Sequence, residues 1–141
     1  MICSMRENDI DCVKKMDQQS SLFWPRQYYL KSLKSKNFFA FLAQKDSQCV
    51  GNIMFRLINT NVNIDKIVVK KEFRYQGIGT KLLEKAIGIG KSKNANQVFL
   101  TVSDGNIYAI DFYTKHGFVI ESIQWFHYFD FDHGVKMYRT I

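Results

Sequence analysis

One short stretch of this chain reads Arg74-Tyr75-Gln76-Gly77-Ile78-Gly79-Thr80. A β-branched segment, residues 64–69, precedes it, and residues 82–87 follow with the apolar spacing of a helix. Glycine lets backbone N–H groups turn inward without a Cβ clash. The first turn of a helix adds unpaired N–H donors and the positive end of the helix dipole. Strand, turn and helix together predict a site for a phosphate or pyrophosphate group.

The spacing differs from that of the common nucleotide-binding loops. The three-glycine dinucleotide fingerprint is absent, and so is the Gly-Lys-Ser/Thr ending of a P-loop. The pattern is Arg-x-x-Gly-x-Gly, formed by Arg74, Gly77 and Gly79. Taken alone, these glycines are also explained by close packing of a helix on a strand.

A second segment lies one expected helix and one expected strand further along the chain. It contains Asn106, Ala109, Tyr113 and then Gly117-Phe118. In this order, the two segments resemble the two signatures of the GNAT (Gcn5-related N-acetyltransferase) family, which binds acetyl-coenzyme A. The resemblance covers residues 62–118 well and the flanks loosely. Within the family, the chain loosely resembles the branch that acetylates protein N-termini and ribosomal proteins.

Bulk properties fit a single domain spanning residues 1–141. Hydrophobic residues make up 46% of the chain and charged residues 23%, as in ordinary globular proteins. No apolar run is long enough to span a bilayer, so no membrane partner is expected. The three scattered cysteines indicate free thiols in the cytoplasm, and no metal-ligand spacing is present. The net charge of +7 comes from dispersed lysines, so we expect coenzyme A phosphates rather than nucleic acid as the anionic partner.

Apolar periodicity predicts two helices, three strands, a helix, a strand, a helix and two final strands. Such an order indicates an α/β (α+β) sandwich around one sheet. The resemblance implies a central mixed, mostly antiparallel sheet that is splayed between its fourth and fifth strands and flanked by about four helices. The expected elements span residues 7–19, 25–33, 38–43, 49–58, 62–69, 79–91, 98–102, 106–116, 118–123 and 135–138.

The resemblance also implies how acetyl-CoA is held. The glycine loop binds the pyrophosphate, a backbone N–H of the fourth strand polarises the thioester carbonyl, and Asn106 contacts the pantetheine arm or a neighbouring carbonyl. The implied cofactor-binding residues are Ile67, Val68, Val69, Arg74, Tyr75, Gln76, Gly77, Ile78, Gly79, Thr80, Asn106 and Tyr113.

The resemblance assigns Tyr113 as the acid that protonates the departing thiolate, and a core aromatic is the alternative. A base is harder to find, because Asn63 and Thr101 occupy the positions where family members carry Glu, Tyr or His. Asp65 shares the face of Asn63 by strand alternation, so we expect it to act as the base, directly or through water. A solvated strand charge is the alternative role, and water alone is a further one.

Aromatic segments give the expectation about the acceptor. Trp24, within Phe23-Trp24-Pro25, and the pair His127-Tyr128 partly match the peptide-holding residues of N-terminal acetyltransferases. With Asn63 and Thr101 they form the expected acceptor-binding set. We expect an acetyl-CoA-dependent N-acetyltransferase acting on a primary amine such as a peptide or protein N-terminus, as a monomer or homodimer. The alternatives are a small-molecule amine acetyltransferase, for a polyamine or antibiotic-like acceptor, and a non-catalytic coenzyme A sensor.

Overall fold

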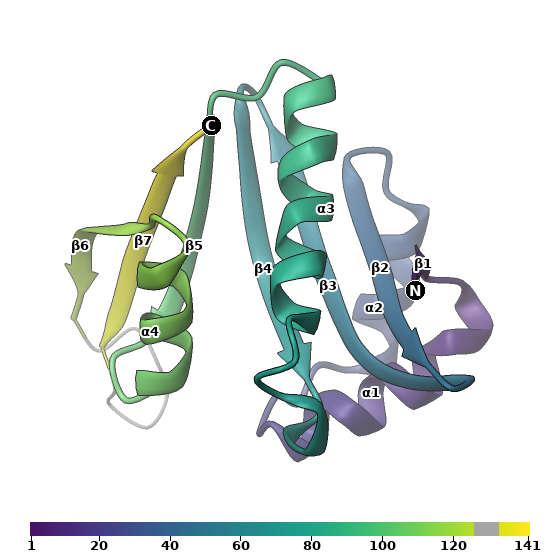
Figure 1. Cartoon of the computed structure of the whole chain (residues 1–141). Coiled ribbons are helices and arrows are strands. Elements are labelled where there is room, and N and C mark those ends of the chain that lie inside the picture. The colour runs from purple at the N-terminus through teal and green to yellow at the C-terminus, as the bar shows by residue number, and fades with distance from the viewer. Residues whose placement is uncertain (126–132) are drawn as a thin grey trace.

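The structure, a computed structural model, describes residues 1–125 and 133–141. Its strands are β1 (Ile2–Ser4), β2 (Phe38–Lys45), β3 (Gln48–Ile58), β4 (Asn61–Val69), β5 (Gln97–Ser103), β6 (Val119–Gln124) and β7 (Gly134–Thr140). Its α-helices are α1 (Ile10–Gln19), α2 (Arg26–Lys34), α3 (Ile78–Ser92) and α4 (Ile107–Lys115), with short 3-10 helices at Glu7–Asp9 and Lys71–Phe73. These strands form one sheet in the order β1-β2-β3-β4-β5-β7-β6 (Figure 1).

The sheet opens between β4 and β5, as predicted. These two strands run parallel and pair only from Asn61 to Ile64, opposite Gln97 to Leu100. Beyond that point β4 remains paired with β3 and β5 with β7, and the strands diverge into a wedge (Figure 1). All other strand pairs are antiparallel. The expected mixed, mostly antiparallel sheet with four α-helices is therefore confirmed.

Strand β1 is absent from the predicted order, and its presence makes Asn61–Val69 the fourth strand. At three residues it is too short to show a period-two pattern, and it is held by pairing with β2. The other predicted elements agree with the structure to within a few residues. Asn106 caps α4 by accepting from Ala109 N, and Gly117 ends that helix with a φ of 84°.

Helices cover both faces of the sheet. In Figure 1, α3 and α4 lie on the face toward the viewer, and α1 and α2 lie behind. The main core lies under α3 and α4, and a second core under α1 and α2. Helix α3 continues past Gly88 and Gly90 to Ser92. A Cβ at Gly90 would lie 2.5 Å from Val62 Cγ2, so the glycine permits the close approach of α3 to β4.

One extra residue in β4 changes which face each side chain meets. Phe55 pairs with Ile64 and Met54 with Lys66, so Asp65 has no partner of its own and forms a β-bulge. Before the bulge, even-numbered side chains pack into the core under α3; after it, the odd-numbered side chain of Val69 does. Lys66 therefore points to the side of α1 instead of the side of α3, which simple alternation from Ile64 would give.

No helix among residues 1–125 and 133–141 combines the length and apolar character that crossing a membrane requires.

Candidate active site

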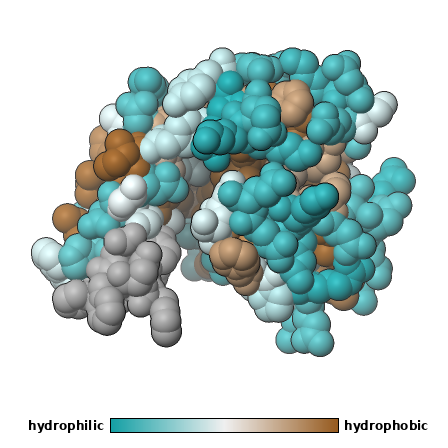
Figure 2. All heavy atoms as spheres, turned by 90° about the horizontal axis from the view of Figure 1, so that it is seen from below, coloured by the Kyte–Doolittle hydropathy of each residue, from teal (hydrophilic) through white to brown (hydrophobic). Residues whose placement is uncertain are grey.

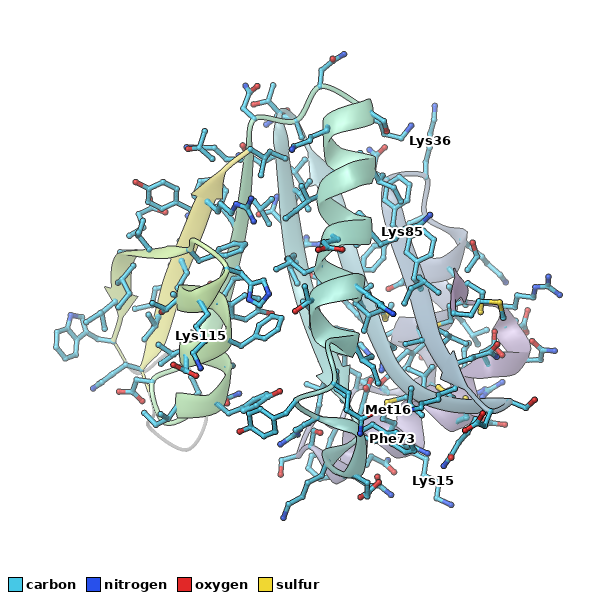
Figure 3. The ribbon with its side chains drawn as sticks, viewed as in Figure 1. Lys15, Met16, Lys36, Phe73, Lys85 and Lys115 are labelled. Carbon is cyan, nitrogen blue, oxygen red and sulfur yellow. The ribbon has the colours of Figure 1, made fainter. Side chains whose placement is uncertain are left out.

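The glycine loop has the geometry of an anion-binding turn. Gly77 is the residue before α3, with a φ of 82° that side chains rarely adopt. Within the described chain, no side chain caps α3 at Gly77, so the N–H groups of its first turn face outward uncapped. A cavity of about 120 Å³ lies beside this turn. Its wall includes Phe73 before the loop and Lys115 of α4, both labelled in Figure 3.

Side chains of the loop hold its shape, and Arg74 and Tyr75 also border the cavity. The Nε of Arg74 donates to the carbonyl of Val69 at 3.2 Å, and its guanidinium lies 4.8 Å from the centre of the Tyr108 ring. Gln76 Oε1 accepts from Lys45 Nζ at 2.9 Å. Tyr75 has a φ of 63° and is 88% exposed. The uncapped backbone N–H groups at the start of α3 are available as anion donors.

A hydrogen-bonded chain joins α3 to α4 across the cavity. His116 Nδ1 donates to the carbonyl of Phe112 at 2.7 Å, so Nε2 of the neutral ring accepts from the Thr80 hydroxyl at 2.8 Å. Gly79 packs against the same helix, because a Cβ there would lie 3.1 Å from the Phe112 ring. These contacts join α3, on the β4 side of the wedge, to α4, on the β5 side.

The end of β4 supplies further donors. Past Ile64 it pairs with β3 on one side and has no pairing with β5, so alternate N–H groups in Ile67–Val69 face the wedge. From below, the surface is indented between the two halves of the molecule, and hydrophilic side chains cover most of the visible face (Figure 2). The loop and the end of β4 fit a pyrophosphate with a carbonyl group near it.

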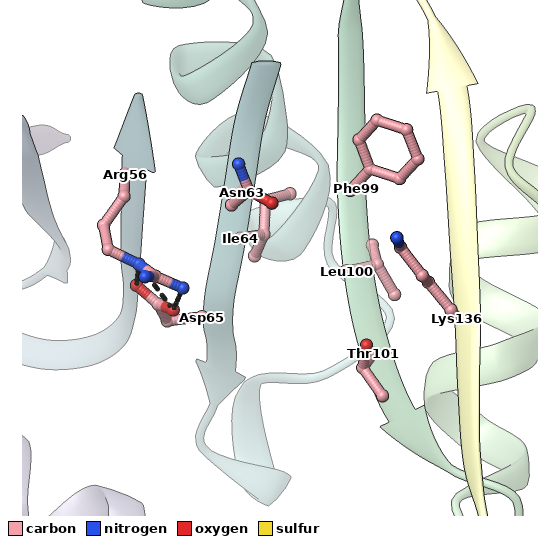
Figure 4. Close-up of a pocket in the computed structure, with 8 residues that line it drawn as sticks. All are labelled: Arg56, Asn63, Ile64, Asp65, Phe99, Leu100, Thr101 and Lys136. Atoms are coloured by element: carbon pink, nitrogen blue, oxygen red, sulfur yellow. Dashed lines mark hydrogen bonds and ion pairs between the residues drawn. The ribbon is translucent and has the colours of Figure 1, made fainter. Parts of the chain in front are cut away.

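A second cavity, of about 270 Å³, lies where β4 and β5 part (Figure 4). We call it the acceptor hollow. Three predicted residues, Asn63, Asp65 and Thr101, meet there although they come from two strands. The remaining lining residues are Arg56, Ile64, Phe99, Leu100 and Lys136.

Arg56 is the electrostatic partner of Asp65. The Nε of Arg56 lies 3.1 Å from both carboxylate oxygens of Asp65, and its Nη2 lies 2.8 Å from Oδ1. Burial raises the pKa of the Asp65 carboxyl above its usual value, and the Arg56 guanidinium opposes that rise. The hollow thus holds a carboxylate whose proton affinity is set by two opposed effects.

Arg56 and Lys136 were not identified from the sequence. The signal was present in the register: Arg56 lies opposite Asn63 in the β3–β4 hairpin, and Lys136 lies opposite Thr101 between β5 and β7. Lys136 Nζ lies 4.8 Å from the centre of the Phe99 ring and 3.6 Å from Glu121. Both cations belong to strands that were predicted, but no motif marked them.

The acetyltransferase (GNAT) family model matches residues 7–118. This chain belongs to the GNAT family. It is 30% identical over 131 residues to an N-alpha-acetyltransferase of Sulfurisphaera tokodaii, covering 83% of this chain and 78% of that protein. It is 38% identical over 93 residues to streptothricin acetyltransferase A of Bacillus subtilis. That match covers 65% of this chain, and the chain spans only about half, 54%, of that relative's length.

A solved structure extends the similarity to the bound cofactor. A putative streptothricin acetyltransferase from Bacillus anthracis, in complex with acetyl coenzyme A, superposes with a TM-score of 0.74 at 25% identity. The superposition covers 80% of this chain and 68% of that one. The prediction of a GNAT fold and of an acetyl-CoA-dependent N-acetyltransferase is confirmed at the level of the family. Acetyl-CoA is the cosubstrate of this GNAT chain.

Tyr113 of this GNAT protein lies in the main core. It is 5% exposed and packs against the rings of Phe112 and Phe118 at 5.2 and 5.3 Å. Burial raises the pKa of its phenol. Its hydroxyl makes no hydrogen bond within the described residues, and Tyr113 borders neither cavity. Its position fits a core aromatic, and its role as an acid stays a prediction.

Trp24 borders neither cavity, and its neighbour Tyr28 lies beside Phe38, which pairs with Arg56 of the hollow. The Trp24 and Tyr28 rings are 4.7 Å apart in an edge arrangement. Two further predicted residues, His127 and Tyr128, lie outside the described residues. Asn106 is exposed at the start of α4, where its side chain caps the helix. Among the described residues, no group of His, Cys, Asp or Glu has the arrangement of a metal site.

Proposed function

We propose that this chain transfers the acetyl group of acetyl-CoA to the α-amine of a peptide or protein N-terminus. The observation that carries the proposal is the acceptor hollow, where Asp65 lies beside the point at which β4 and β5 part. An α-amino group has a reference pKa near ~8, against ~10.4 for a lysine amine. At neutral pH a larger fraction of an α-amine is therefore already unprotonated. This suits a site that has Asn and Thr, and no proton acceptor, at positions 63 and 101.

The residues of the loop and of β4 would hold the cosubstrate. Acetyl-CoA supplies the activated acetyl thioester. The N–H groups of Ile78, Gly79 and Thr80 at the start of α3 would bind its pyrophosphate, and a free N–H in Ile67–Val69 would stabilise the carbonyl oxygen. The fit rests on the uncapped first turn of α3 and on the absence of a Cβ at Gly77 and Gly79.

Two groups are assigned to proton transfer. Asp65 accepts the proton of the attacking amine, directly or through a water molecule, while Arg56 opposes the rise in the pKa of the carboxyl that burial causes. Tyr113 donates a proton to the departing thiolate, since burial keeps its phenol protonated at neutral pH. Asn106 is assigned to the pantetheine arm, and Trp24, Asn63, Thr101, His127 and Tyr128 to the acceptor.

The similarity to streptothricin acetyltransferase A supports a second candidate, a small-molecule amine acceptor such as a polyamine or an antibiotic-like amine. Two observations favour the peptide. The N-alpha-acetyltransferase match spans most of both chains, and the hollow carries Arg56 and Lys136, whose charges repel a polycation. A non-catalytic coenzyme A sensor would have no use for Asp65 beside the wedge.

We further assign the protein to the cytoplasm, as a monomer or homodimer, with no nucleic-acid partner. Cys3, Cys12 and Cys49 are free thiols, which supports a reducing compartment.

A competition among acceptors tests the proposal. Peptides with free or blocked N-termini, each with an internal lysine, are offered beside spermidine and an aminoglycoside, and release of free thiol from acetyl-CoA is followed. We expect rapid acetylation of free N-termini only, with the acetyl group located by mass spectrometry. Efficient acetylation of a small polyamine with none on any peptide N-terminus would refute the peptide proposal and leave the family activity in place.

A further inference from the structure

A buried polar network lies on the face of the sheet under α1 and α2. Lys66 of β4 is 7% exposed, and Asp17 of α1 and Asn52 of β3 are fully buried. The Lys66 ammonium contacts the carboxylate of Asp17 and the amide oxygen of Asn52. Asp17 also accepts from Asn52 Nδ2 at 3.0 Å and from the Tyr29 hydroxyl at 2.6 Å. Every member of the network therefore has hydrogen-bond partners, and Asp17 and Asn52 fix the position of the Lys66 ammonium.

The same ammonium lies beneath the segment that joins α1 to α2. Lys66 Nζ is 5.3 Å from the centre of the Trp24 ring and 5.3 Å from that of Tyr29. At this distance a buried cation is attracted to the face of an aromatic ring. Trp24 in turn contacts Tyr28, whose ring centre is 4.7 Å away. The Lys66 ammonium thus contacts Trp24, which in turn contacts Tyr28.

Tyr28 links Trp24 to the neighbourhood of the acceptor hollow. Burial raises the pKa of the Tyr28 phenol, and the Asp65 carboxylate raises it further while Arg56 opposes it. The Tyr28 ring also lies 6.4 Å from the ring of Phe38, which pairs with Arg56 between β2 and β3. A path of contacts therefore runs from Lys66 through Trp24 and Tyr28 to the strand position that carries Arg56 of the hollow.

We propose that Lys66 is a positioning residue for the acceptor: its buried ammonium holds Trp24, and through it Tyr28, against the acceptor hollow. The proposal rests on the proposed function, because it takes this side of the sheet as the acceptor side. The Lys66 charge neutralises the buried carboxylate of Asp17, which a methionine at position 66 would leave without its cation. The contact with the Trp24 ring gives the same charge a second use.

The contact should weaken in alkaline solution. Burial lowers the pKa of Lys66 to about 8, although Asp17 opposes the shift. The groups that face Lys66 are Asp17 from α1, Tyr29 from α2, Asn52 and Cys49 from β3, and Asp65 from β4. The Cys49 thiol, whose pKa is raised to about 12, stays protonated between pH 7 and about 9.5, and burial raises the pKa of the Tyr28 and Tyr29 phenols above the usual value. Lys66 is then the group of this cluster that changes charge in that interval.

The test uses the fact that the chain has 2 tryptophans. Replacing the exposed Trp125 by Phe leaves Trp24 as the single tryptophan, whose emission is excited selectively at the red edge of the absorption band. We expect Trp24 emission in this background to change with a midpoint near pH 8, and expect no such change after Lys66→Met. Lys85→Met is the matched control, because Lys85 Nζ lies 5.1 Å from the Phe41 ring on the other face. The control should keep the transition.

Kinetics give the second measurement. Lys66→Met should raise the KM for the acceptor peptide at least fivefold while the acetyl-CoA Kd from calorimetry changes less than twofold. Trp24→Leu should have a similar effect, and the double variant should be no worse than either single one. Lys85→Met should leave both constants within twofold.

Three results would overturn the proposal: a Trp24 emission that is flat from pH 7 to 9.5, an unchanged acceptor KM in folded Lys66→Met, or strictly additive effects in the double variant. If Lys66→Met does not fold, the pH titration of the Trp125→Phe protein still decides the question. If the wild type acetylates no peptide, the proposed function fails, whereas the emission titration still reports on the contact itself.

Discussion

Arg56 and Asp65 are joined by three hydrogen bonds across the β3–β4 hairpin, from 2.8 to 3.1 Å in length. The side chain of Asp65 is only 10% exposed, whereas that of Arg56 is 41% exposed. A buried carboxylate is therefore neutralised by a cation that solvent and substrate can reach. In the proposed reaction, Arg56 sets how readily Asp65 takes a proton from the amine.

Asp65→Asn keeps the shape of the side chain and removes its ability to accept a proton. If Asp65 is the base, kcat/KM for the acceptor should fall by roughly 10²-fold at pH 7.5. The acetyl-CoA Kd measured by calorimetry should stay within twofold. Asp46→Asn, in the exposed β2–β3 turn, is the control and should keep full activity. Full activity of Asp65→Asn would instead assign the proton to water.

Arg56→Met should move the pH dependence of the reaction. Burial raises the pKa of Asp65 and Arg56 lowers it, so removal of the guanidinium raises the pKa further. The base form then appears only at higher pH, and the acidic limb of the kcat/KM profile should shift to higher pH. An acidic limb that stays in place would show that Asp65 does not control the reaction.

Gly77→Asp and Gly79→Asp should abolish acetyl-CoA binding. Gly77 has a φ of 82°, which aspartate adopts only with strain, and a Cβ at Gly79 would lie 3.1 Å from the Phe112 ring. Each change also places a negative charge where the pyrophosphate is expected. Gly88→Ala is the control: its Cβ meets no atom within 4 Å, so it should bind acetyl-CoA normally and gain roughly 0.5–1 kcal/mol of stability. Unchanged affinity in both aspartate variants would contradict the assignment of the loop.

Tyr113→Phe removes one hydroxyl and keeps the ring in the core. If the hydroxyl protonates the thiolate, kcat should fall at least about tenfold with the acetyl-CoA Kd unchanged. Phe118→Leu disturbs the same aromatic cluster without touching the hydroxyl, so it should lower stability and spare turnover. A fully active Tyr113→Phe enzyme would leave Tyr113 as a core residue only.

Lys66 should make stability rise with pH. Its folded pKa of about 8 lies below the ordinary 10.5, so between these values the unfolded chain binds more protons than the folded one. Raising the pH from 8 toward 10 therefore increases the free energy of unfolding, by at most roughly 3 kcal/mol. Chemical denaturation at pH 7.5, 8.5 and 9.5 measures the slope, and Lys66→Met should lack this contribution. Equal slopes in both proteins would mean that Lys66 titrates normally.

Sequence patterns accounted for most of the elements of the fold because each has a local cause. Asn106 and Gly117 mark the ends of α4, and Gly77 marks the start of α3. The first strand, Ile2–Ser4, had no such signal, since its existence depends on pairing with a segment about 40 residues away.

The candidate site was predictable only in part. The loop and Asp65 belong to motifs or stand next to them, whereas Arg56 and Lys136 reach the hollow through strand register. The network of Asp17, Asn52 and Lys66 joins three elements distant in sequence, and strand alternation alone places Lys66 on the opposite face. Long-range contacts of this kind have no local pattern.

The bulge at Asp65 acts as a change of phase in β4. The four residues that follow it take their side of the sheet from one unpaired position. If Asp65 were instead paired with Met54 in a regular ladder, each later residue would move by one place, which would turn the Lys66 ammonium into the hydrocarbon under α3 and Val69 outward. The bulge therefore lets two consecutive side chains, those of Asp65 and Lys66, face the same side of the sheet: one lines the acceptor hollow, and the other completes the buried network with Asp17 and Asn52.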